Sequence, residues 1–184
     1  VPGTTVDGEM IAATQPFPTM PQLLMPIGAV TPETVWGLTD ADRAFVAAID
    51  AHLARIRNPE LVFYVHGYRV AFDEVAVQMG SFAHYLGQQA TVTFQWPTGT
   101  NFWNYLLDSP RAHQYIPDIE RMLLLLAQTK AQHINVMAYS CGSPLLAAAL
   151  DRLRSRNHEL DHEALQRRYR LGNVIFVASD VDLK

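Results

Sequence analysis

From residue 61 onward, segments that favour β-strands alternate with segments that favour α-helices, and this alternation limits the possible folds more than any other feature. Runs of apolar and β-branched residues predict four strands, at 61–65, 91–96, 134–139 and 174–178. Apolar residues at helical spacing predict the intervening helices, at 72–86, 110–130 and 143–156. Successive strand–helix–strand units place their strands parallel in one sheet. We therefore expect an α/β fold, an open, mostly parallel sheet with helices on both faces.

The N-terminal part of the chain has a different character. Six of the 11 prolines fall before residue 35, and no Lys or Arg precedes Arg43. We expect residues 1–38 to form an irregular, proline-rich arm or short edge strands. A helix follows, capped by Asp40 and ended by Asn58 and Pro59. The chain is therefore predicted to consist of an arm, 1–38, and an α/β core, 39–184.

Composition excludes several classes of protein. With 184 residues, of which 49% are hydrophobic and 17% charged, the chain can bury one sizeable core. Its net charge of −4 argues against a nucleic-acid-binding protein. No apolar run approaches the ~20 residues of a membrane span. Cys141 is the single cysteine, which excludes an internal disulfide and a multi-cysteine zinc site. We expect no cofactor, no nucleic-acid partner and no membrane span.

The most informative strand end is the sequence Ala-Tyr-Ser-Cys-Gly at residues 138–142. It follows an apolar strand and precedes a helix with Pro144 in its first turn. Small residues two positions before and two after Ser140 fit the G-x-S-x-G nucleophile elbow, with alanine replacing the first glycine. The helix start supplies N–H groups suited to a developing oxyanion. The alternative is an ordinary strand–turn–helix with a serine cap, and these five residues alone do not decide between the two.

Two further strand ends carry residues suited to a substrate site. Gly67, after His66, permits close approach of the backbone, and the N–H of Tyr68 is suited to act as a second oxyanion donor beside that of Cys141. For His66 itself we favour a half-buried histidine that bonds to backbone. The predicted pocket is completed by aromatic residues around the second and third strand ends, namely Trp96, Trp103, Tyr105 and Tyr139.

Four motifs in register carry a family resemblance. They are His-Gly-Tyr at 66–68, Trp-Pro-Thr at 96–98, Ala-Tyr-Ser-Cys-Gly at 138–142 and Ala-Ser-Asp-Val-Asp at 178–182. Together they resemble a bacterial α/β-hydrolase family of uncharacterised function, over about residues 61–182. The resemblance implies Ser140 as the nucleophile and the N–H groups of Tyr68 and Cys141 as the oxyanion hole. Tyr139 stands where that family more often has histidine, and Cys141 where it often has methionine.

A serine nucleophile needs a base, and the chain order in this fold is Ser, then Asp or Glu, then His. Of the seven histidines, only His158 and His162 follow Ser140, and both precede the acids after the fourth strand. Asp180 or Asp182 is a candidate for the acid, with the cap of a turn as the alternative. We expect a part of a longer or two-piece enzyme in which another polypeptide segment supplies the histidine. An inactive binding relative is the alternative.

His158, Glu159 and His162 also match H-E-x-x-H, which on a helix holds zinc between two imidazoles. Asp180 or Asp182 would be the third ligand. Arginines surround the motif, and Asp161 inside it suits a helix cap, so we favour a solvated connector over a metal site.

The expected function is a serine hydrolase that cleaves a carboxylic ester or related acyl bond of a small molecule. A non-catalytic binding module and a zinc hydrolase are the alternatives. The proline-rich arm behind a non-Met start and the lone cysteine favour a periplasmic or secreted protein over a cytoplasmic one, although an engineered terminus would look the same.

Overall fold

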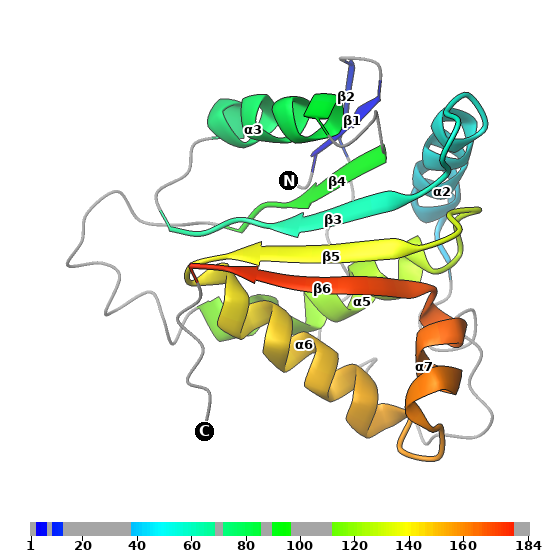
Figure 1. Cartoon of the computed structure of the whole chain (residues 1–184), viewed down its shortest axis with the longest axis vertical. Coiled ribbons are helices and arrows are strands. Elements are labelled where there is room, and N and C mark those ends of the chain that lie inside the picture. Colours follow the sequence, from blue (N-terminus) through cyan, green and yellow to red (C-terminus); the bar gives the residue numbers. More distant parts are fainter. Residues whose placement is uncertain are drawn as a thin grey trace.

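The computed structural model describes residues 3–6, 9–12, 38–68, 72–85, 90–96 and 112–178 (Figure 1). Its strands are β1 (Gly3–Val6), β2 (Glu9–Ala12), β3 (Leu61–Val65), β4 (Ala90–Phe94), β5 (Ile134–Tyr139) and β6 (Leu171–Val177). Its helices are α2 (Asp40–Leu53), α3 (Phe72–Tyr85), the 3-10 turn η2 (His113–Tyr115), α5 (Ile116–Leu126), α6 (Gly142–Arg156) and α7 (His162–Tyr169).

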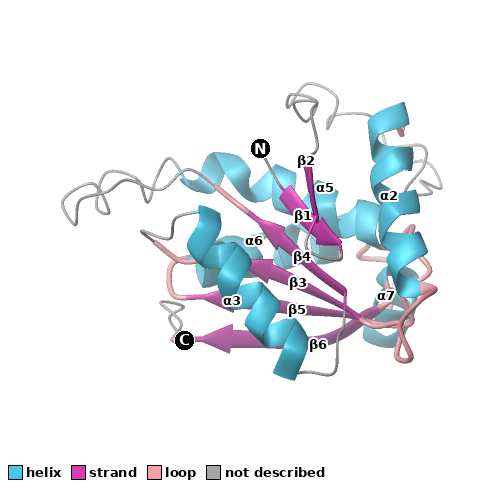
Figure 2. Cartoon of the chain, turned by 90° about the horizontal axis from the view of Figure 1, so that it is seen from above, coloured by secondary structure: helices cyan, strands magenta, loops and turns pink. Residues whose placement is uncertain are grey.

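The strands form a six-stranded sheet in the order β2-β1-β4-β3-β5-β6. The four strands β4, β3, β5 and β6 are parallel, whereas β1 and β2 pair antiparallel at the β4 edge. Helix α3 covers one face of the sheet, and α5 and α6 cover the other (Figures 1 and 2). The predicted open, mostly parallel sheet with helices on both faces is therefore confirmed. None of the described helices is long and apolar enough to cross a membrane.

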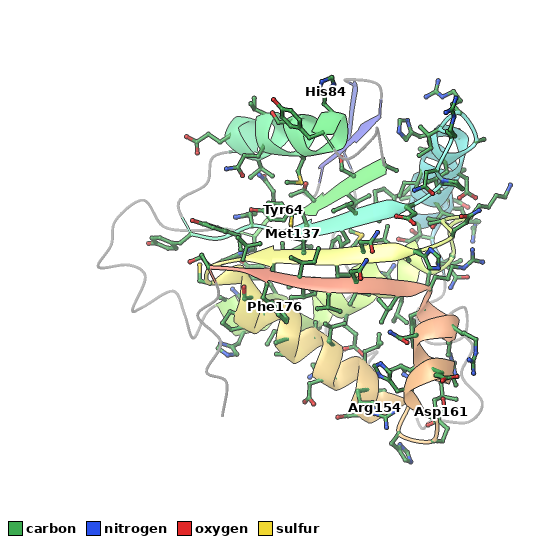
Figure 3. All side chains as sticks on the ribbon, viewed as in Figure 1. Tyr64, His84, Met137, Arg154, Asp161 and Phe176 are labelled. Atoms are coloured by element: carbon green, nitrogen blue, oxygen red, sulfur yellow. The ribbon has the colours of Figure 1, made fainter. Side chains whose placement is uncertain are left out.

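The two faces of the sheet bury separate clusters. Every residue of β3 is buried, as its continuous apolar run predicts for a strand covered on both faces. Tyr64 and Met137 point toward α3 (Figure 3), where they pack with Val75 and Met79. Phe63 belongs to the larger cluster on the opposite face, which α2, α5 and α6 complete.

Several predicted boundaries differ from the observed ones. Thr39, not Asp40, caps α2, because its hydroxyl accepts the N–H of Asp42 while the Asp42 carboxylate accepts the N–H of Thr39. Within the range predicted as a helix, 110–130, a 3-10 turn at His113–Tyr115 precedes the α-helix Ile116–Leu126. Pro117 lies in the first turn there, the place in a helix where a missing N–H costs least.

Strand β6 begins at Leu171, three residues before the predicted start at 174. The earlier start was not predicted because Gly172 and Asn173 interrupt the apolar run. Asn173 is held in the sheet by the Asn135 side chain, whose oxygen accepts hydrogen bonds from the Asn173 backbone and side chain. The four residues that follow, from Val174 to Val177, are each 40–44% exposed.

A buried carboxylate links α5 to α6. Glu120 is 1% exposed; Arg152 Nε donates to its Oε2 at 3.1 Å, and Arg156 Nε forms an ion pair with its Oε1 at 2.8 Å. Both arginines reach solvent with part of their side chains. A charge this deeply buried depends on its partners, because it has lost its hydration.

We expect simultaneous replacement of both arginines, Arg152→Met with Arg156→Met, to lower the free energy of unfolding by about 3 kcal/mol, since it leaves Glu120 buried without a partner. Each single replacement should cost less, because the other arginine remains. Adding Glu120→Leu to the double variant should restore part of the loss. Urea denaturation measures all four variants. A double variant within about 0.5 kcal/mol of the wild type would contradict this role for Glu120.

Candidate active site at the carboxyl edge of the sheet

Three strand ends meet at one edge of the sheet. The parallel strands β3, β4 and β5 all end at the same edge, on the left of Figure 1. Val65 pairs with Phe94 on one side and with Ala138 on the other. The segments that follow these residues are therefore brought together, and in open parallel sheets this edge is where ligands bind.

Ser140 occupies a strained turn between β5 and α6. Its φ is +49°, in the left-handed region that L-residues rarely adopt. Its N–H donates to the Val177 carbonyl at 2.9 Å, and its own carbonyl accepts the N–H of Ser143 at 2.9 Å. The serine is partly exposed. Residues 139–142 thus form a sharp elbow between strand and helix, the local geometry that the predicted nucleophile-elbow motif requires.

Two glycines allow the elbow to pack against the end of β3. A Cβ at Gly142 would lie 2.5 Å from the His66 carbonyl oxygen and 2.7 Å from that of Val65, both backbone atoms. A Cβ at Gly67 would lie 2.8 Å from Cδ1 of Tyr139 and 3.2 Å from Cβ of Ser140. Gly142 of the motif is therefore explained by backbone contact with the end of β3, and Gly67 by its contact with Tyr139 and Ser140.

His66 and Trp96 form a buried unit behind the elbow. The Trp96 N–H donates to His66 Nε2 at 3.1 Å, and the indole N–H donates to the His66 carbonyl at 3.0 Å. His66 Nδ1 lies 2.6 Å from the Gly67 carbonyl oxygen. The two rings stack at 5.7 Å between centroids, and the residues are only 2% and 5% exposed. Burial lowers the pKa of His66, although its bond to the Gly67 carbonyl acts in the opposite direction.

The predicted pocket residues differ in their exposure to solvent. His66 bonds to backbone groups, as favoured from the sequence, but it is fully rather than half buried, and Trp96 is buried beside it. Their place in a substrate pocket stays a prediction. Gly67 is also buried, whereas Tyr139 is 42% exposed beside the serine. Trp103 and Tyr105 lie outside the described residues.

The structure describes the histidines of the chain but not the two candidate acids. All seven histidines belong to the described part of the chain, and none of them hydrogen-bonds the Ser140 hydroxyl there. Asp180 and Asp182 lie outside the described residues. The end of β6 nevertheless reaches the elbow, since the Val177 carbonyl accepts the Ser140 N–H and Ala178 follows with a φ of +46°.

The H-E-x-x-H segment does not form the helix that zinc binding requires. His158 lies in the turn after α6, and α7 begins only at His162. Asp161 caps α7 by accepting the Ala164 N–H at 2.7 Å, as expected for the connector (Figure 3). The 15 residues of α6, about 22 Å long, separate the motif from Ser140. Nowhere in the described ranges do three or more His, Cys, Asp or Glu side chains gather in a metal-binding group.

The strain at Ser140 predicts an unusual order of stability. We expect Ser140→Gly to be about 1 kcal/mol more stable than Ser140→Ala, because glycine adopts a positive φ without steric cost. At Ser81, in the exposed face of α3, the same pair should show the opposite order, since alanine favours a helix. Thermal and urea denaturation measure both pairs. Equal stability of the two Ser140 variants would show that the turn is not strained.

The contact at Gly142 predicts a large effect of one methyl group. Gly142→Ala should lower the free energy of unfolding by about 2 kcal/mol or more, because its neighbours are backbone carbonyls that cannot turn aside. Gly80 in α3 is the matched control, with nothing within 4 Å of an added Cβ. Gly80→Ala should raise stability by about 0.5–1 kcal/mol. Urea denaturation distinguishes them, and a harmless Gly142→Ala would contradict the packing described above.

Comparison with known proteins adds the family. No curated protein and no solved structure matches the chain significantly. One family model does match, described as an alpha/beta hydrolase of unknown function (DUF900), and it covers residues 41–184. That range contains the four parallel strands, the elbow at Ser140 and both glycines of its packing. The chain belongs to this family of α/β-hydrolases.

Proposed function

We propose that the protein is a serine hydrolase that cleaves a carboxylic ester or related acyl bond of a small molecule, with Ser140 as nucleophile. The observation that carries the proposal is the left-handed φ of Ser140, +49°, in a turn between a parallel strand and a helix. A non-glycine residue held in this conformation costs of order 1–3 kcal/mol and persists at sites where the geometry is used. Membership of an α/β-hydrolase family supports the same reaction class.

The proposed chemistry is acyl transfer through the serine. The Ser140 oxygen attacks the substrate carbonyl carbon while its proton passes to a histidine base. The N–H groups of Cys141 and Tyr68, the first at the start of α6, hold the oxyanion that forms. The bond to the leaving alcohol then breaks as the histidine returns the proton to it. Water hydrolyses the acyl-serine in the reverse sequence and releases the carboxylic acid.

The acid and the base complete the proposal. Asp180 or Asp182 is proposed as the acid, which the hydrogen bond between the end of β6 and Ser140 supports. The histidine is proposed to come from another polypeptide segment lying along β6. The exposure of four consecutive apolar residues there, Val174 to Val177, supports this, because parallel strands are ordinarily buried on both faces.

A non-catalytic binding module is the second candidate. It is favoured by the seven histidines, none of which hydrogen-bonds the Ser140 hydroxyl in the described ranges.

A periplasmic or secreted location is proposed from the sequence alone.

Labelling with a fluorophosphonate probe tests the function. We expect the natural protein to be labelled and Ser140→Ala to lose labelling completely, because the probe reacts only with an activated serine. Ser143→Ala is the control, since Ser143 is fully buried in α6 and should leave labelling intact. Persistent labelling of Ser140→Ala would contradict the nucleophile, and an unlabelled but stably folded natural protein would favour the binding module. Full labelling of these 184 residues alone would contradict the separate segment.

A further inference from the structure

We propose that His66 is a positioning residue, which orients the Gly67–Tyr68 peptide so that the Tyr68 N–H faces the oxyanion. This inference rests on the proposed function, because it assigns a task to a side chain that the acyl-transfer scheme leaves unused. His66 is among the most fully buried large side chains of the described residues and lies two residues before Tyr68, the proposed oxyanion donor. From the sequence it was predicted to be a half-buried histidine that bonds to backbone.

The hydrogen bonds of His66 fix its tautomer. Nε2 accepts the N–H of Trp96 at 3.1 Å, so this nitrogen carries a lone pair and no proton. The proton of the neutral ring is therefore on Nδ1, where the Gly67 carbonyl oxygen lies 2.6 Å away and accepts it. Each ring nitrogen thus has one partner of the matching kind. The lowered pKa of the buried imidazole agrees with a ring that stays neutral.

The Gly67 carbonyl controls the direction of the Tyr68 N–H. Both groups belong to one planar trans peptide, in which C=O and N–H point in opposite directions. A hydrogen bond that holds the carbonyl toward the buried imidazole therefore turns the N–H away from it. Glycine has few steric limits on rotation of this peptide, so a fixed orientation needs such a bond.

The imidazole is itself held firmly. The Trp96 ring stacks against it, with 15° between the planes, and the indole N–H bonds the His66 carbonyl. That same carbonyl is the atom closest to a Cβ built on Gly142, at 2.5 Å. One residue therefore contacts both proposed halves of the oxyanion hole, the Gly67–Tyr68 peptide through its ring and the start of α6 through its carbonyl. Such support is what a preorganised donor requires.

Two variants test the two hydrogen bonds of the His66 ring separately. In His66→Asn the amide nitrogen replaces Nδ1 and can still donate to the Gly67 carbonyl. In His66→Gln the amide replaces Nε2, so the bond to Trp96 is kept and the donor to Gly67 is lost. We expect His66→Gln to lower kcat for 4-nitrophenyl acetate by about 10- to 100-fold with KM nearly unchanged, and His66→Asn to retain much more of kcat.

The measurements include one that does not depend on activity. A long-range ¹H–¹⁵N correlation spectrum of the wild type should show Nδ1 protonated and Nε2 bare, and the opposite tautomer would overturn the inference. Denaturation of both variants shows how far each is destabilised. A purely structural role would lower stability and kcat together in both, and would also overturn the inference. Selective loss of kcat in His66→Gln, with recovery in His66→Asn, supports it.

Failure of the proposed function has a different signature. If the natural protein hydrolyses the ester and His66→Gln equals it in kcat, the positioning role is overturned while the nucleophile assignment stands. If the natural protein neither hydrolyses the ester nor reacts with fluorophosphonate, the proposed function is overturned. In that case the orientation of the peptide is tested by two measurements that need no activity. One is the His66 tautomer by NMR. The other is hydrogen exchange of the Tyr68 amide, which should be faster in His66→Gln than in His66→Asn.

Discussion

The close approach of Gly142 to the end of β3 is the constraint on which the site depends. The carbonyl oxygens of Val65 and His66 occupy the space that any side chain at position 142 would need. This contact seats the first turn of α6 against β3, although the helix continues from β5. The elbow, the His66 carbonyl and the Gly67–Tyr68 peptide are consequently parts of one packed structure, and its geometry is set by backbone atoms.

The parallel register supplies the rest of this arrangement. Val65 pairs with Ala138, so the residues after them leave the sheet side by side. Ser140 then turns through a left-handed conformation whose cost, about 1–2 kcal/mol, is offset by hydrogen bonds to Val177 and Ser143. The bond to Val177 also ties the elbow to β6. Three strands thus hold Ser140 in one orientation, as the proposed nucleophile would require.

Sequence patterns were most reliable where structure is local. The bounds of β3 and β5 were predicted to the residue. For β3 the reason is a continuous apolar run that is buried on both faces of a parallel sheet. Sequence patterns failed where two neighbouring residues were both suited to cap a helix. Thr39 and Asp40 are both good caps, and only the reciprocal bonds with Asp42 select Thr39. The start of β6 was missed because Asn173 is held by a side chain of the neighbouring strand.

The sequence by itself determined the α/β architecture and the position of the strained serine, since both follow from residues close together in the chain. A strand, a small–x–Ser–x–Gly turn and a proline-started helix need only short-range sterics. Tertiary structure alone decided the state of His66, because its tautomer depends on Trp96, 30 residues away, and on the burial that both strands create. The separation of His158 from the helix of His162 is, by contrast, local, since Asp161 caps α7 through a residue three positions later, as the sequence predicted. Hydrogen bonds between residues far apart in the chain leave no periodic pattern in the sequence from which they could be predicted.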